Sequence, residues 1–334
     1  MKNKMKKTAQ PSFIAPMLAT LTTDYFSSND WIYEHKFDGI RCLAVKKNNI
    51  VHIMSRNHRI INDEYPEIVK ALEQQSADNF IIDGEIVATS KGLSDFELLQ
   101  SRINLKDIKS IQSKIKLVPI TFCIFDLLYT DGYDIRTVPL LDRKKMLKKL
   151  LRYNKLLLYT EHTKGDGVTF FHKACKAKWE GVIAKKADSI YESRRSRSWL
   201  KFKCIMQQEL VIGGYTEPRG QRDRFGALLV GYFKGNSFMY AGKVGTGFDA
   251  ATIAMLYKKM KRIEIKTCPF TNFDISSYGV HWIKPQLVAE FQFAEWTRSG
   301  KLRVGRYKGL RTDKSAKLVV KEVPKALPGV HKKK

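Results

Sequence analysis

Lys36 lies in a short run of charged residues between two apolar stretches. The alternation of Trp31 and Tyr33 predicts a strand that ends near Lys36, Gly39 permits a tight turn, and residues 40–45 predict a second strand. A lysine held at the edge of a strand beside an acid can act as a nucleophile. Because the ordinary pKa of lysine is about 10.4, this amine attacks only if burial or neighbouring cations lower that value. On its own, the run fits a surface lysine in a polar turn better than a nucleophile, because short motifs match by accident.

Further segments along the chain carry residues of the kinds that bind phosphates, sugars, bases and cations. They are Ser55-Arg56-Asn57, Asp83-Gly84-Glu85, Phe125-Asp126, Glu180 to Lys185, Trp199 to Lys203, and Arg311 to Lys314. Lys201 and Lys203 alternate on a predicted strand, so both side chains point to the same face. Two ammonium groups there would stabilise charge growing on a phosphate and would help to lower the pKa of Lys36. The alternative is an ordinary amphipathic strand, in which Lys201 and Lys203 lie on the face exposed to solvent.

The elements that must position these residues follow from periodicity, capping and turn signals. We expect a hairpin turn at 46–49 with a returning strand at 51–55, helices at 65–75, 94–103, 141–151 and 250–261, and strands at 80–82, 86–88, 118–129, 181–185, 199–203 and 287–296. Ser94 and Glu97 would form the capping box of the second helix. The lysines of the helix at 141–151 are expected on its exposed face.

The character of the chain changes after Cys204, where short strands with frequent glycines replace the mixed pattern. Such spacing is typical of a small twisted antiparallel barrel. We therefore predict two domains, 13–204 and 205–322, flanked by mobile basic tails at 1–12 and 323–334.

Sixty Lys and Arg residues against 33 Asp and Glu give a net charge of +27 over 334 residues. The basic residues are spread through a chain that is 43% hydrophobic, which indicates a folded protein rather than a basic tail. This excess is larger than solubility requires and predicts a polyanionic partner such as nucleic acid.

Five cysteines are scattered along the chain without a CxxC pair. This pattern argues against a structural zinc site and a disulfide framework, and for a reducing cytosol. The basic N-terminus is followed by no apolar region, and no run is long enough to span a membrane, so we expect a soluble protein with no membrane partner.

Taken in order and spacing, the segments above resemble the motifs of the covalent nucleotidyltransferases: ATP-dependent DNA ligases, RNA ligases and mRNA capping enzymes. Pro16-Met17-Leu18-Ala19, the segment 290–297 and Gly309-Leu310-Arg311 narrow the resemblance to the ligase module of the bacterial end-joining ligases, over residues 13 to 320. The fold that this resemblance implies is α+β. An N-terminal nucleotidyltransferase (adenylation) domain of antiparallel sheets with helices is followed by a C-terminal OB-fold β-barrel.

The resemblance also implies a role for each matching residue. Lys36 would take AMP from ATP as a phosphoramidate, with Lys201, Lys203 and Lys185 around the α-phosphate. The other implied roles are adenine recognition by Glu34, partly through backbone, adenine stacking by Phe125, ribose binding by Glu85, Mg²⁺ or Mn²⁺ binding by Glu180 with Glu85, and phosphate contacts by Arg41 and Arg56. A hard cation that also bridges phosphate oxygens needs only one or two carboxylates from the protein.

In the second domain, Arg311, Asp313 and Lys314 match the last family motif, which docks over ATP when the domains close. A hinge near residue 204 is implied. Two departures from the family pattern stand out: His58 follows Ser55-Arg56-Asn57 where relatives commonly have glycine, and residues 302–307 replace a run that often contains His-Pro.

The resemblance implies an ATP-dependent DNA ligase that seals 3′-hydroxyl/5′-phosphate nicks in double-stranded DNA, in DNA repair or end joining. An RNA ligase, a GTP-using capping enzyme, or a basic OB-containing binding protein without activity are the alternatives. Ku or other end-joining proteins would be partners, the protein would be a monomer, and its location would be the cytoplasm, associated with the nucleoid if bacterial.

Overall fold

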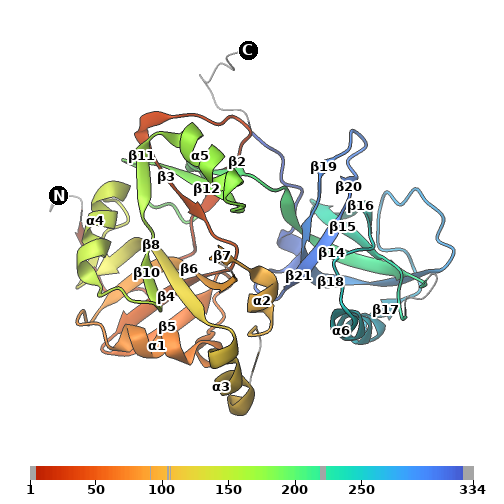
Figure 1. The fold of residues 1–334 in the computed structure, drawn as a ribbon, viewed down its shortest axis with the longest axis horizontal. Coiled ribbons are helices and arrows are strands. Elements are labelled where there is room, and N and C mark those ends of the chain that lie inside the picture. Colours follow the sequence, from red (N-terminus) through yellow and green to blue (C-terminus); the bar gives the residue numbers. More distant parts are fainter. Residues whose placement is uncertain (1–4, 91, 104, 106, 219–222, 326–334) are drawn as a thin grey trace. The chain divides into compact units, whose positions relative to one another are not determined.

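The computed structural model of the chain describes residues 5–90, 92–103, 105, 107–218 and 223–325, and these form two units (Figure 1). The first holds the described residues up to Cys204 together with Pro324 and Lys325, and the second runs from Ile205 to Val323. None of the helices in these described ranges is both long and apolar enough to cross a membrane.

The first unit is built on two sheets. The larger has the strand order β1-β9-β8-β6-β4-β5, and in addition β10 pairs with β8 and β7 pairs with β6. Its strands are β1 (Lys6–Lys7), β4 (Ile40–Lys47), β5 (Ile50–Ser55), β6 (Phe80–Ser90), β7 (Leu93–Ser94), β8 (Ile120–Thr130), β9 (Tyr133–Asp134) and β10 (Leu157–Tyr159). The smaller has the order β11-β3-β12-β13-β2, from β2 (Leu18–Leu21), β3 (Ser28–Lys36), β11 (His162–Gly165), β12 (Gly181–Lys186) and β13 (Arg195–Lys203).

Helices cover the outer faces of both sheets. They are α1 (Pro66–Glu73), α2 (Phe96–Gln100), α3 (Ile108–Leu117), α4 (Leu140–Leu150) and α5 (Gly167–Lys176), with a 3₁₀ turn at Asn62–Glu64. Figure 1 shows α5 against β3 and β12, where Tyr33, Val182 and Phe202 form a core on that face. A separate apolar cluster lies between the sheets, and it includes Met17, Phe125, Tyr191 and Trp199.

The second unit contains a sheet of order β16-β15-β14-β18-β17, with β21 on β18, and a hairpin of β19 and β20. Its elements are β14 (Gln207–Thr216), β15 (Leu228–Lys234), β16 (Ser237–Val244), α6 (Ala250–Lys261), β17 (Glu264–Ile265), β18 (Val280–Gln292), β19 (Glu295–Trp296), β20 (Leu302–Arg303), β21 (Arg306–Arg311) and a 3₁₀ turn at Ala316–Leu318. The α+β class, with mainly antiparallel sheets and helices followed by a small β unit, is confirmed. Two pairs of the first unit are parallel, β10 with β8 and β2 with β13.

Several local predictions need correction. Asp83-Gly84-Glu85 does not separate two strands but lies inside β6, where a register shift against β8 absorbs the irregularity. The predicted capping box at Ser94 is wrong, because Asp95 caps α2 by accepting from the Leu98 amide and Ser94 ends β7. Part of the expected N-terminal tail is ordered, since Lys6–Lys7 pair with β9 as strand β1. Residues 1–4 and 326–334 of the two predicted tails lie outside the described residues.

The cysteine interpretation also needs correction. Cys175 at the end of α5 and Cys204 after β13 form a disulfide, with an S–S distance of 2.04 Å. Their sequence separation of 29 residues carries no recognisable spacing signal. The pairing arises because α5 packs against the sheet whose last strand leads to Cys204.

Candidate active site

The predicted nucleophile lies on one face of the smaller sheet together with the predicted phosphate-binding lysines. In the strand register, Gly181 faces both Lys36 and Lys203, and Ile183 faces both Glu34 and Lys201. Because side chains alternate along a strand, these cations and Lys185 project from the same face. The opposite face carries His35 and the apolar residues under α5. A Cβ at Gly181 would collide with the Phe202 carbonyl, so glycine allows the close approach of β12 and β13.

Lys36 is the last residue of β3, and its Nζ pairs with Oε2 of Glu180. The side chains of Lys36 and Glu180 are only 17% and 6% exposed. Burial alone lowers the pKa of Lys36, but the charges of Glu180, Asp38 and Glu85 outweigh it and raise the pKa above its ordinary value. The expectation that neighbours lower this pKa is therefore wrong for the protein without ligands. In the protein without ligands, the amine is therefore held as an ammonium ion paired with Glu180.

Glu34 forms a buried triad with two lysines. Its Oε1 lies 2.5 Å from Nζ of Lys144, and its Oε2 lies 2.6 Å from Nζ of Lys185. All three side chains are at most 2% exposed, and Lys144 also donates to the Thr160 carbonyl at 2.9 Å. Burial raises the pKa of Glu34, but the two lysines reverse this and lower it. Both carboxylate oxygens are therefore engaged within the protein, and the side chain of Glu34 serves first to hold Lys185.

Arg41 is fixed from the larger sheet. Its guanidinium donates to both carboxylate oxygens of Asp83, at 2.9 and 2.6 Å, and Asp83 also accepts from the Tyr191 hydroxyl at 2.6 Å. The guanidinium carbon lies 5.1 Å from the centroid of Phe125 and 5.5 Å from that of Trp199. Such a bidentate pair sets the orientation of an arginine tightly.

Phe125 lies at the rim of the space between the sheets and is 9% exposed. Nζ of Lys185 is 4.3 Å from its centroid and 4.1 Å from the centroid of Trp199. An aromatic face bordered by cations can stack on a base while the cations approach its phosphates. The structure thus brings Phe125, Arg41 and Lys185 together with the lysine face of the smaller sheet.

The predicted cation ligands are Glu180 and Glu85. Glu180 precedes β12 and is 8% exposed, and Glu85 lies in β6 directly opposite Arg41. The described residues contain no group of three or more His, Cys, Asp or Glu that could hold a metal. Mg²⁺ usually takes one or two carboxylates and completes its shell with water and substrate phosphates. The Glu180 oxygen that faces Lys36 fits such a site.

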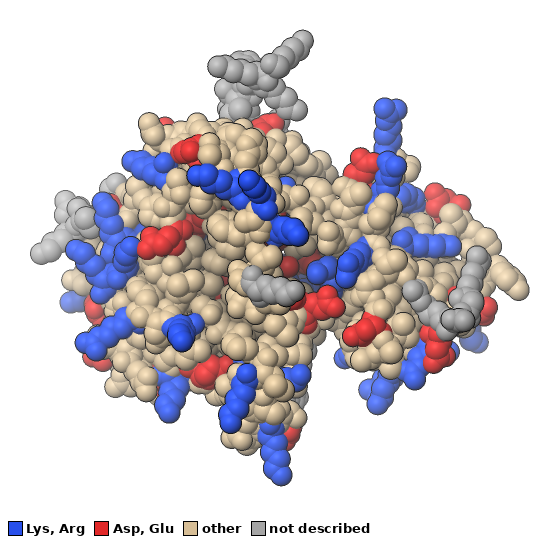
Figure 2. All heavy atoms as spheres, in the orientation of Figure 1, with Lys and Arg blue, Asp and Glu red and all other residues tan. Residues whose placement is uncertain are grey.

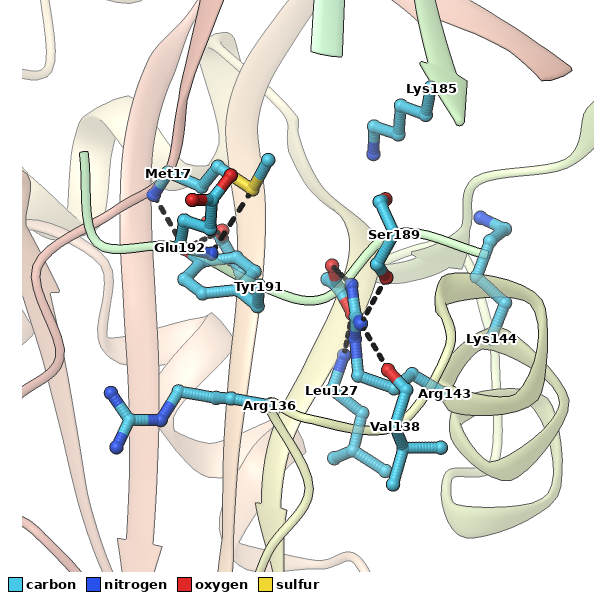
Figure 3. Close-up of polar contacts among 12 residues, drawn as sticks. Met17, Leu127, Arg136, Val138, Arg143, Lys144, Lys185, Ser189, Tyr191 and Glu192 are labelled. Carbon is cyan, nitrogen blue, oxygen red and sulfur yellow. Dashed lines mark hydrogen bonds and ion pairs between the residues drawn. The ribbon is translucent and has the colours of Figure 1, made fainter. Parts of the chain in front are cut away.

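A buried ion pair holds the backbone beneath this site (Figure 3). Arg143 of α4 donates to both oxygens of Asp126 at 2.8 and 2.9 Å, and neither side chain is exposed. It also donates to the carbonyls of Val138 at 2.6 Å and Ser189 at 2.9 Å. Because Asp126 follows Phe125 and Ser189 lies in the connection from β12 to β13, one guanidinium joins three segments of the site.

Arg56 follows β5 in a turn and is half-buried. His58 has a φ of 63°, the left-handed conformation that a glycine would adopt, and its ring stacks on Phe13 at 4.3 Å. The turn that carries Arg56 is therefore compatible with histidine at this position, because stacking offsets the cost of the backbone conformation.

The remaining predicted residues lie in the second unit. Arg311 ends β21 and donates to both oxygens of Asp313 at 2.8 and 2.9 Å, while Glu290 lies 3.8 Å from its Nη1. Lys314 pairs with Glu209 of β14. Both cations of this motif are thus held by carboxylates of their own unit.

Sequence reasoning missed Lys144, Arg143 and Asp83, and for the first two a signal was present. Leu140, Arg143, Lys144 and Leu147 are all buried and follow the i, i+3, i+4, i+7 pattern of a core-facing stripe. The expectation that the lysines of this helix face solvent is therefore wrong for Lys144. Asp83 belongs to the Asp83-Gly84-Glu85 segment, in which the sequence predicts a role for Glu85 only.

The chain matches two described families. Residues 16–203 match the ATP dependent DNA ligase domain, and residues 221–314 match the ATP dependent DNA ligase C terminal region. These matches cover Lys36, Glu180 and Lys201 in the first unit, and Arg311 and Lys314 in the second.

Similar proteins include multifunctional proteins that are longer than this chain. The chain is 34% identical over 330 residues to the multifunctional non-homologous end joining protein LigD of Pseudomonas aeruginosa, which covers 96% of this chain and 38% of that protein. It is 36% identical over 319 residues to the multifunctional non-homologous end joining DNA repair protein LigD of Mycobacterium tuberculosis, covering 92% of this chain and 40% of that protein. The chain thus spans well under half the length of these relatives.

A solved structure of mycobacterial DNA ligase D complexed with ATP and MES is similar in fold, with a TM-score of 0.65 and 33% identity. The match covers 92% of this chain and 98% of that one.

Proposed function

We propose, on the premise that this chain belongs to the ATP-dependent DNA ligase family, that it seals 3′-hydroxyl/5′-phosphate nicks in double-stranded DNA through a covalent lysyl-AMP intermediate. The observation that carries the proposal is the single sheet face on which Lys36, Glu180 and the two lysines of β13 meet. A nucleophilic amine surrounded by cations, beside an acid, is what transfer of a nucleotidyl group requires.

In the first step, Nζ of Lys36 would attack the α-phosphorus of ATP and pyrophosphate would leave. Lys201 and Lys203 face the same side as Lys36 and would stabilise the charge that develops on the phosphate oxygens. The amine must first lose a proton to solvent, because an ammonium cannot attack and the Glu180 carboxylate keeps Lys36 protonated. A divalent cation, Mg²⁺ or Mn²⁺, held by Glu180 and Glu85 would draw the charge of Glu180 away and offset phosphate charge.

In the second step, AMP would pass from Lys36 to the 5′-phosphate of the nick, and in the third the 3′-hydroxyl would attack that phosphate and release AMP. The cations spread over both units would hold the DNA through its phosphates, without sequence specificity and with strong salt dependence. Figure 2 shows Lys and Arg side chains on the visible surface of each unit.

The biological setting is proposed from the relatives, two of which are named for non-homologous end joining. We propose a role in end joining or related repair, with Ku or another end-binding protein as partner. We also propose that the protein acts as a monomer in the cytoplasm, at the nucleoid if the cell is bacterial.

Incubation with α-labelled ATP and Mg²⁺, followed by denaturing electrophoresis, tests the chemistry. Wild-type protein should retain label that nicked DNA discharges, and Lys36→Ala should retain none. Lys186→Ala is a matched control, since Lys186 is an exposed lysine of β12.

Discharge by nicked RNA but not by nicked DNA would move the activity to RNA ligation. Preferential labelling by GTP would indicate a capping enzyme. No label, even after pyrophosphate has removed any AMP already bound, would leave a nucleic-acid-binding protein without activity and would overturn the proposal.

A further inference from the structure

Tyr191 is a buried tyrosine whose hydroxyl has two polar partners in the first unit. The hydroxyl oxygen lies 3.0 Å from the Met17 amide nitrogen and 2.6 Å from Oδ2 of Asp83. Figure 3 shows the Met17 amide directed at this hydroxyl. Because a backbone amide can only donate, the hydroxyl accepts from Met17, and its single proton is directed to Asp83. The hydroxyl of Tyr191 is therefore used both as a donor and as an acceptor.

The carboxylate of Asp83 links this hydroxyl to Arg41. Asp83 is fully buried and holds Nε and Nη2 of Arg41 on its two oxygens. The side chain of Arg41 is 18% exposed, so part of its guanidinium is open to a phosphate while Asp83 is not. The position of the Asp83 carboxylate thus sets the direction in which Arg41 meets a ligand.

The contact joins the two sheets of the first unit. Arg41 and Asp83 belong to β4 and β6 of the larger sheet, whereas Tyr191 lies in the connection between β12 and β13 of the smaller one. The amide of Tyr191 donates to the Arg136 carbonyl at 2.8 Å, which fixes this connection. A shift of about 1 Å between groups that act on one substrate can cost roughly 100-fold in rate. The alignment of Arg41 with the lysine face of the smaller sheet therefore matters for catalysis.

The N-terminal segment around Met17 holds the tyrosine in place. Met17 is fully buried, and its Sδ accepts from the Glu192 amide at 3.3 Å. The amide of Leu18 donates to the Arg194 carbonyl at 3.0 Å. Backbone and side-chain contacts thus fasten this segment along the chain that follows Tyr191.

We propose that Tyr191 is a positioning residue, which orients Arg41 through Asp83 and is itself held by the segment around Met17. This inference rests on the proposed ligase function and deepens it, because it assigns the group that aligns a phosphate-binding arginine with the lysines of the other sheet. The ring of Tyr191 packs edge-on against Trp199, with centroids 5.8 Å apart. Phenylalanine would pack in the same way, so the hydroxyl is the part of Tyr191 that the positioning requires.

Tyr191→Phe removes this hydroxyl and leaves the ring. Tyr129→Phe is the matched control, because Tyr129 lies in the same apolar cluster and its hydroxyl donates to the Thr8 carbonyl at 2.9 Å. Lysyl-AMP formation and nick sealing are measured separately in single turnover, and Arg41→Ala identifies the step that depends on Arg41. Tyr191→Phe should slow that step about 10-fold, as expected for one lost hydrogen bond to a charged group, and Tyr129→Phe should not slow it.

A double variant distinguishes positioning from a general loss of structure. If the hydroxyl acts through Arg41, Tyr191→Phe combined with Arg41→Ala should be no slower than Arg41→Ala alone. Rate losses that multiply in the double variant would overturn the inference. An unchanged rate in Tyr191→Phe, or an Arg41→Ala variant that is unimpaired in both steps, would also overturn it.

A measurement on the folded protein tests the positioning without any activity. In protein labelled with ¹⁵N-arginine, the Nε–H signal of Arg41 is assigned by its loss in Arg41→Ala. Its exchange with solvent should be slow in the wild type and in Tyr129→Phe, and about 10-fold faster in Tyr191→Phe. Equal exchange in wild type and Tyr191→Phe would overturn the inference, whereas failure of the wild type to form lysyl-AMP would overturn only the proposed function.

Discussion

The buried pair of Arg143 and Asp126 allows a quantitative test of how the site is supported. In Arg143→Met, the carboxylate of Asp126 stays in a fully buried position without its cation. Breaking such a pair costs about 3–5 kcal/mol, a large part of the roughly 5–15 kcal/mol that stabilises a typical domain. For a unit of this size, that corresponds to a decrease of about 6–20 °C in the unfolding temperature.

The assay is urea unfolding followed by hydrogen exchange and mass spectrometry, peptide by peptide. Peptides of β8 report on the first unit, and peptides of β18 provide an internal reference in the second. Arg136→Met is the matched control, because the Arg136–Asp134 pair lies at the surface and is only half-buried (34% and 18% exposed), so that it should be worth at most about 1 kcal/mol. Figure 3 shows both arginines.

A second variant separates the lost charge from lost packing. In Arg143→Met combined with Asp126→Leu no charge remains buried, so the double variant should be more stable than Arg143→Met by about 2 kcal/mol or more. The uncompensated charge of Asp126 is not the cause of the lost stability if Arg143→Met costs less than about 1 kcal/mol, or if the double variant is no more stable than the single one.

Three further outcomes are expected. Burial lowers the pKa of His35 from 6.5 to about 4. As pH falls from 6.5 to about 4, the unfolded chain therefore binds the proton first, and the first unit should lose roughly 3 kcal/mol of stability. Urea unfolding measured at a series of pH values should show this loss, and His35→Phe should abolish it. The Cys175–Cys204 disulfide closes a 29-residue separation, so Cys175→Ser should lower stability by about 3 kcal/mol without reductant and have no effect in its presence, whereas equal melts in both conditions would argue against the bond. Glu209→Gln frees Lys314 from its carboxylate and should lower the KM for ATP in lysyl-AMP formation up to about 5-fold; a raised KM would mean that Glu209 positions Lys314 productively.

Local sequence patterns were sufficient to predict many of the strands, turns and helices of this protein. Alternation and turn residues predicted the strand ending at Lys36, and Asn48 and Asn49 do form the hairpin turn with positive φ. The helix expected at 250–261 matches α6, with Asp249 as its cap. These features depend on neighbours a few residues apart, which is the range over which propensity and capping act.

The ordered motifs also carried the family resemblance, and strand alternation alone was enough to predict that Lys201 and Lys203 share one face. The charge excess predicted a polyanionic partner for a similar reason: composition needs no tertiary information.

The tertiary structure decided what surrounds each functional group. That Glu180 raises the pKa of Lys36, that Glu34 is held by Lys144, and that Cys175 meets Cys204 all depend on segments distant in sequence. Charges and thiols act over a few ångströms in space, and spacing along the chain does not reveal which partners a sheet brings to that distance. The residue types at this site could therefore be predicted from the sequence. Their protonation states and their ion-pair partners depend on how the two sheets pack.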